Sequence, residues 1–157
     1  MLPVDALQQM YQQVILDHAK KPHGRVAALP EPEPGAAISH QINPTCGDEI
    51  TLELQVKDGK IAELTWEGQG CSISQASASV MNDIVKNAEL KDARAAEQVF
   101  LELMNSRGKG LADEKAEEVL GDAVAFTGTS QYPARIKCAL LGWMALKDAI
   151  AKVENNG

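Results

Sequence analysis

Residues 50–67, ITLELQVKDGKIAELTWE, decide the fold. Apolar and polar residues alternate through the first half of this stretch, which is the period of a strand with one buried face. Asp58-Gly59 is a pair typical of a two-residue hairpin turn, so residues 60–67 are expected to return as the antiparallel partner. The apolar positions that define the buried face are Ile50, Leu52, Leu54 and Val56.

The pattern on either side of this hairpin completes a small α+β fold. Residues 37–43 are expected to add one more strand, and the pattern becomes helical after Gly68, with Ser72 or Ser74 as the helix N-cap. Strands followed by helices predict an α+β two-layer domain over residues 1–157, with a three-stranded antiparallel sheet packed on one face by helices. The other helices are expected at residues 5–20, 92–106 and 113–120, and from Pro133 onward.

Composition limits the classes of function. The 157 residues are 45% hydrophobic and 24% charged, as in an ordinary soluble protein, and carry a net charge of −7. That acidity argues against nucleic-acid binding, which needs a concentrated basic face. No stretch reaches the ~20 apolar residues of a membrane span, and the N-terminus lacks the pattern of a secretory signal. We therefore expect a cytoplasmic protein that binds neither nucleic acid nor membrane.

Three cysteines are the candidate chemical groups, and an odd number in a reducing compartment argues against a disulfide framework. Cys46 lies in Asn43-Pro44-Thr45-Cys46-Gly47-Asp48, a predicted turn at a strand end. Its thiol and the Asp48 carboxylate can both face one cation there. A turn that merely contains Cys and Asp explains this segment equally well.

Cys71 follows Gly68 and Gly70 at the expected start of a helix. Free amide groups and the helix dipole favour a thiolate at that position. A small buried cysteine in a glycine-rich turn is the alternative. Cys138, one turn inside the last helix, is typical of a core residue, but the flanking Arg135 and Lys137 can balance the charge of an anionic metal site.

Spacing alone does not define the site. The cysteines are 25 and 67 residues apart, unlike the close pairs of zinc fingers. Sulfur-rich ligands suit zinc, Cu(I) or iron–sulfur clusters, so the metal stays open on this ground. The histidines are weaker ligand candidates. His18 lies on the first helix, His23 follows it, and His40 is expected to be an ordinary strand residue.

Four segments resemble the SufU branch of the IscU/NifU-N family of iron–sulfur assembly proteins. The resemblance covers nearly the whole chain. Scaffold members of that family carry a His immediately before the last cysteine, where this chain has Lys137, and the long interval between residues 71 and 138 also favours the SufU branch. The segments are DHAKKPHG (17–24), NPTCGDEI (43–50), GQGCSISQASASVM (68–81) and YPARIKCALLGWMAL (132–146).

The resemblance implies a set of roles. Cys46, Asp48, Cys71 and Cys138 would bind zinc, and Cys46 would accept sulfur as a persulfide from a SufS-type cysteine desulfurase. Arg135 would lie close to the site or to the partner's active site. Downstream Suf scaffold proteins are further possible partners, and a monomer is expected. The alternatives are an IscU-like scaffold that holds a [2Fe-2S] cluster or iron on the same ligands, and a purely structural zinc site.

Overall fold

The computed structural model describes residues 4–45 and 47–156, and it has the α+β architecture that the sequence predicts. Three strands form one antiparallel sheet in the order β1-β2-β3. Asp58 and Gly59 join β2 to β3 with φ values of 55° and 76°. Two successive positive φ values define the turn expected from that pair. The strands are β1 (Ala37–Asn43), β2 (Asp48–Lys57) and β3 (Lys60–Gln69).

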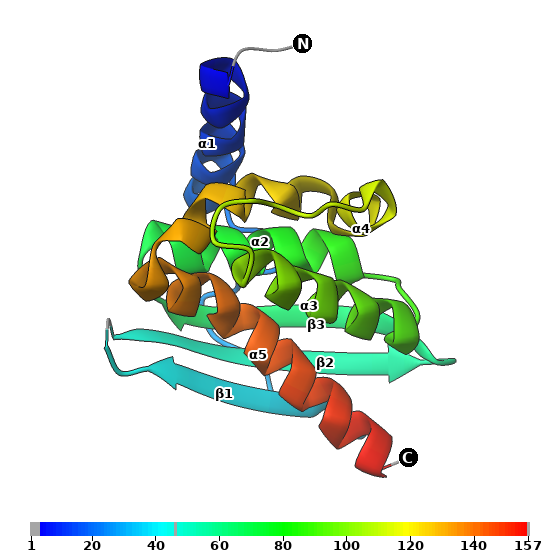
Figure 1. The fold of residues 1–157 in the computed structure, drawn as a ribbon. Helices are drawn as coiled ribbons and strands as arrows, with labels where there is room; N and C mark the ends of the chain where they lie inside the picture. Colours follow the sequence, from blue (N-terminus) through cyan, green and yellow to red (C-terminus); the bar gives the residue numbers. More distant parts are fainter. Residues whose placement is uncertain (1–3, 46, 157) are drawn as a thin grey trace.

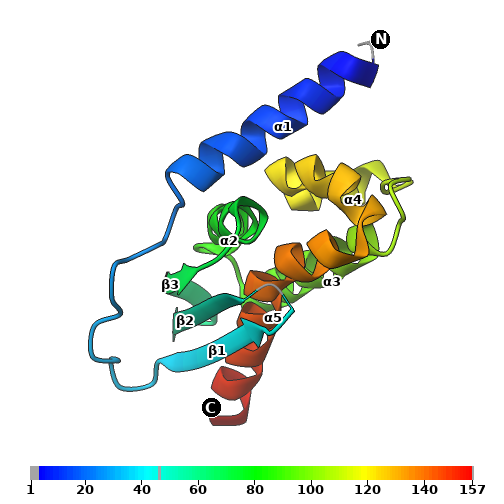
Figure 2. The same ribbon diagram turned by 90° about the vertical axis from the view of Figure 1, so that its left-hand side faces the viewer.

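The helices all lie on one side of the sheet (Figure 2). The predicted helices are present with ends shifted by one or two residues, and an 11-residue 3-10 helix that the sequence pattern did not indicate precedes the last one. The elements are α1 (Val4–Lys20), α2 (Ser72–Val85), α3 (Leu90–Met104), α4 (Glu114–Leu120), η1 (Gly121–Gln131) and α5 (Pro133–Asn156).

Helix α5 crosses β1 and β2, and α2 packs beside it, whereas α1 lies on the far side of α2 against η1 (Figure 1). The contact between α2 and α5 is close because its residues are small: a Cβ on Gly142 would lie 3.2 Å from the Cβ of Ala78. The Ser77 hydroxyl donates to the Ala139 carbonyl at 2.6 Å and accepts from the Trp143 indole at 3.1 Å. This junction fixes the part of α5 that carries Cys138.

The arm between α1 and β1 pairs with the edge strand β3 at Trp66. The amide of Val26 donates to the Trp66 carbonyl at 2.8 Å, and the Trp66 amide donates to the Gly24 carbonyl at 2.9 Å. An edge strand left unpaired would expose these groups to other chains. The arm therefore protects β3 and holds the end of α1 beside α2. Within the described ranges, no helix is long and apolar enough to cross a membrane.

Candidate metal centre

Asp48 begins β2 at the end of the β1–β2 turn. Its strand partner is Asn43, whose carbonyl accepts from the Gly47 amide at 2.8 Å and whose side-chain oxygen accepts from the Thr45 amide at 3.2 Å. Gly47 has a φ of 74°, a conformation that glycine adopts without strain. The carboxylate of Asp48 is thus fixed, and only 1% of the residue is exposed.

Cys71 is the N-cap residue of α2, so the expectation that Ser72 or Ser74 caps this helix is wrong. The Ser74 hydroxyl instead donates to the Cys71 carbonyl at 3.0 Å. The amide of Cys71 donates to Asp48 Oδ1 at 2.9 Å, and its thiol lies 3.8 Å from Asp48 Oδ2. A carboxylate from the neighbouring strand therefore satisfies a backbone donor at the helix start, and Cys71 remains exposed to solvent.

Cys138 lies near the start of α5 and is 6% exposed. Its thiol contacts the Ala134 carbonyl, one turn earlier, at 3.5 Å. This burial is what we expect of a cysteine in the hydrophobic core. Packing in the core does not explain why the thiol lies beside Asp48 and Cys71.

The donor atoms of Asp48, Cys71 and Cys138 all lie within 4.8 Å of one another. They come from a strand start, a helix cap and the last helix, and are brought together by the packing of α2 against α5. Cys46, the fourth predicted ligand, lies outside the described residues. Two cysteine sulfurs and a carboxylate oxygen are donors that zinc accepts, so these residues fit the metal implied by the sequence resemblance.

Gly70 leaves no space between this carboxylate and α2. A Cβ built on it would lie 2.4 Å from Asp48 Oδ1 and 2.6 Å from Ser74 Oγ, closer than real Cβ atoms approach other heavy atoms. The absence of a side chain here, rather than an unusual backbone angle, lets β3 end against Asp48.

Arg135 lies three residues before Cys138 on α5, a separation that makes two residues neighbours on a helix surface. The residue is exposed, and its guanidinium carbon lies 4.7 Å from the centroid of the Tyr132 ring. Lys137 is also exposed. Both charges face solvent, where an approaching molecule can reach them.

The histidines divide into two groups. His40 is the strand residue that the sequence predicted, and its ring contacts Glu49 at 2.6 Å. His18 and His23 lie together with Asp83 as a second group of donor atoms within 4.8 Å. Sequence spacing gave no signal for this second group, because Asp83 is some 60 residues farther along the chain.

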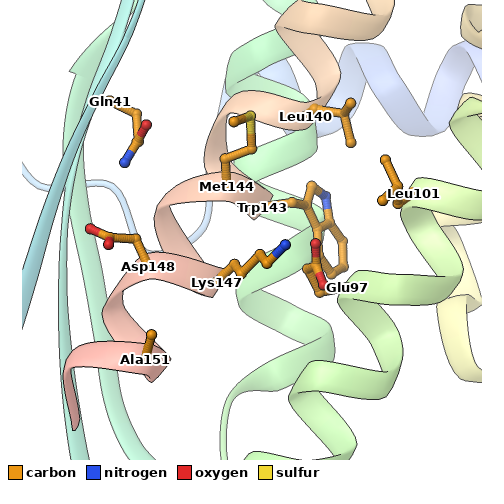
Figure 3. Close-up of a pocket in the computed structure, with 9 residues that line it drawn as sticks. All are labelled: Gln41, Glu97, Leu101, Leu140, Trp143, Met144, Lys147, Asp148 and Ala151. Atoms are coloured by element: carbon orange, nitrogen blue, oxygen red, sulfur yellow. The ribbon is translucent and has the colours of Figure 1, made fainter. Parts of the chain in front are cut away.

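A groove of about 560 Å³ opens beside α5, and Leu101, Leu140 and Met144 lie around the Trp143 ring there (Figure 3). Leu140 follows Cys138 by two residues. Among the described residues that line the groove, none is a cysteine or a histidine. The groove is mainly apolar, and the residues that line it do not include Asp48, Cys71 or Cys138.

Comparison with known proteins gives one consistent result. The NifU-like N-terminal domain model matches residues 10–139. The zinc-dependent sulfurtransferase SufU of Bacillus subtilis is 38% identical over 148 residues, covering 94% of this chain and 94% of that protein. The iron–sulfur cluster assembly scaffold protein IscU of Streptococcus pyogenes serotype M1 is 34% identical over 156 residues, covering 98% of this chain and 91% of that protein.

A solved structure shares the fold. The crystal structure of the N-terminal part of a nitrogen-fixing NifU-like protein from Brucella abortus superposes with a TM-score of 0.79 at 26% identity. The superposition covers 96% of this chain and 99% of that chain. The matched regions include the segments that hold Asp48, Cys71 and Cys138.

Proposed function

The chain belongs to the NifU-like N-terminal domain family, and on that basis we propose that it serves iron–sulfur cluster assembly as a zinc-dependent sulfur acceptor. The observation that carries the proposal is the convergence of Asp48, Cys71 and Cys138 within 4.8 Å. The similarity to a zinc-dependent sulfurtransferase along 94% of the chain supports zinc over other metals.

The proposed zinc ligands are Cys46, Asp48, Cys71 and Cys138. Cys46 is two residues from Asp48, and a two-residue extended chain spans at most about 7 Å, so the length of the chain allows its sulfur to join the other donors. When bound, zinc would keep the cysteine sulfurs deprotonated without redox chemistry of its own. A free cysteine, by contrast, is only a few per cent thiolate at pH 7.

The sulfur donor in this proposal is a SufS-type cysteine desulfurase that carries a persulfide. The thiolate of Cys46 attacks the outer sulfur of that persulfide. A new S–S bond forms on Cys46 while the donor's S–S bond breaks, and its electron pair leaves on the donor cysteine as a thiolate. Cys46 then holds the persulfide for a downstream Suf scaffold protein.

The other residues hold the site while Cys46 reacts. Asp48 stays in place because the Cys71 amide and the turn from Asn43 fix it, and buried Cys138 is held by α5. Arg135 offers a solvent-facing positive charge within reach of a docked partner. We assign this exchange to a monomer acting in the cytoplasm.

The test is transfer of labelled sulfur from a desulfurase, followed by mass mapping of persulfides. Cys46→Ala is expected to abolish sulfur uptake and stimulation of the desulfurase, while Arg135→Ala keeps the metal and weakens stimulation. The control is Lys91→Ala, which changes an exposed charge on α3 that pairs with Glu89 at 3.5 Å. Label recovered on Cys71 or Cys138 of the Cys46→Ala variant would overturn the assignment.

A scaffold role is the second candidate, because the IscU relative that matches 98% of this chain is named as a scaffold. In that case a [2Fe-2S] cluster would assemble on the same side chains. Anaerobic reconstitution with iron and sulfide separates the two functions, since zinc is colourless and a cluster absorbs visible light. The sulfur-acceptor proposal expects stoichiometric zinc in the purified protein and no stable visible chromophore after reconstitution.

A further inference from the structure

His18, His23 and Asp83 meet where α1 ends, and their donor atoms lie within 4.8 Å of one another. We propose that these three side chains form a second site for a divalent transition-metal ion, with the Asp122 carboxylate 4.0 Å from His18 Nε2. The inference does not depend on the proposed sulfur chemistry, because it uses none of the cysteines.

His18 is held in an orientation suited to a ligand. The residue is 8% exposed, and its Nδ1 lies 2.6 Å from Ser79 Oγ. The same hydroxyl oxygen accepts from the His23 amide at 2.7 Å, which ties the arm to α2. With Nδ1 engaged by Ser79, Nε2 is the nitrogen that can bind a metal, and it lies 4.0 Å from Asp122 Oδ2. Metal-binding histidines usually have their second nitrogen fixed in this way.

His23 and Asp83 supply the accessible side of the site. Their side chains meet at 2.7 Å between Nδ1 and Oδ2, and both are about half exposed. The ring centroids of His18 and His23 are 4.8 Å apart with a 59° tilt, so the rings are not stacked face to face. Because both side chains are about half exposed, they can rotate when an ion binds.

The donor set selects the class of metal. Two imidazoles suit zinc, nickel, cobalt and copper, whereas magnesium and calcium prefer oxygen ligands. The carboxylates of Asp83 and Asp122 offset the charge of a divalent ion. Along α2, Asp83 is twelve residues from Cys71, about 18 Å at the helical rise per residue, so this site is distinct from the cysteine centre.

The experiment titrates Ni(II) into the zinc-loaded full chain by calorimetry, with zinc content measured in the same samples. One Ni(II) per chain is expected to bind without release of zinc. Affinity should fall at least tenfold in His23→Gln and in Asp83→Asn. Both residues are exposed, so the fold should survive these changes.

The chain contains a matched control. His40 and Glu49 form an exposed pair at 2.6 Å with exposure close to that of His23 and Asp83, but neither is among the grouped donor atoms. His40→Gln and Glu49→Gln should bind Ni(II) as the parent chain does. In ring-nitrogen NMR spectra, Ni(II) should broaden the signals of His18 and His23 and spare His40. Absence of Ni(II) binding, binding undiminished in His23→Gln and Asp83→Asn, or equal loss in His40→Gln would overturn the site.

Discussion

At the scale of single residues, Gly70 controls the position of the Asp48 carboxylate. Gly70→Ala places a methyl group in steric conflict with Asp48 Oδ1, closer than a Cβ can approach. Because the carboxylate must move, we expect zinc affinity to fall by at least tenfold, measured by competition with a chromophoric chelator. Overpacking of this kind typically costs about 1–3 kcal/mol of stability.

Gly128→Ala is the control for that substitution. Gly128 has an ordinary φ, and a Cβ there meets no atom within 4 Å. Its zinc affinity should equal that of the parent chain. If Gly70→Ala bound zinc as tightly as Gly128→Ala, Asp48 would not be a ligand in the arrangement described.

At the scale of elements, Asp148 and Lys152 connect α5 to the edge strand β1. Lys152 Nζ donates to the Ile38 carbonyl at 2.7 Å and lies 3.1 Å from Asp148 Oδ2. A hydrogen bond from Ser39, followed by one from Lys152, lowers the pKa of Asp148 below its ordinary value of 3.8. The ionised carboxylate therefore stabilises the contact between helix and strand.

The sign of the pH dependence follows from that lowered pKa. Stabilisation by Asp148 is complete above pH 3.8 and is lost as the pH falls through the lower pKa of the folded chain. Asp148→Asn should lower the free energy of unfolding by at most about 1 kcal/mol at pH 7, because the pair is exposed. The difference from the parent should shrink in denaturant titrations toward pH 3. Glu118→Gln, on exposed α4, should show no comparable difference at pH 7.

The sequence predicts those helices and strands whose signals are local. Alternation from Ile50 to Val56 and the Asp58-Gly59 turn predicted the hairpin, because both signals are local. Residues 121–131 escaped prediction since a 3-10 helix with scattered apolar residues has no α-helical period. The cap of α2 was misassigned because the helix begins directly after Cys71, whose amide is bonded by Asp48 from another element.

At the scale of the whole molecule, the donor set joins the sheet to two helices. An ion held by Asp48, Cys71 and Cys138 binds only the folded arrangement, so it stabilises the fold by mass action, about 2.7 kcal/mol at a hundredfold excess over Kd. Chelation should lower Tm by roughly 5–10 °C in a chain of this size. Differential scanning calorimetry with and without chelator measures the shift.

Asp48→Ala provides the comparison for chelation. It removes one ligand, so its Tm should be lower than that of the zinc-loaded parent and nearly insensitive to chelator. A parent chain with the same Tm in both conditions would show that the centre holds no stabilising metal.

The site was only partly predictable, again because of long-range packing. Nothing in the spacing of Cys71 and Cys138 says that they meet, since their approach depends on the small residues Ala78 and Gly142 between α2 and α5. The family resemblance, rather than spacing, pointed to these residues as candidate ligands. His18 and His23 carried no such signal, because Asp83 reaches them only when α1 packs on α2.

Because Cys138 lies on α5, the last helix, it is synthesised after Asp48 and Cys71. Translation adds roughly 5–20 residues per second, so several seconds separate the appearance of Cys71 from that of Cys138. Throughout that interval the nascent chain has only part of the proposed ligand set. This partial set would bind an ion more weakly than the complete set in the folded chain. With the proposed ligands, the ribosome would have to release residues well beyond the sheet before an ion is captured firmly, and acquisition of metal would report that α5 has docked.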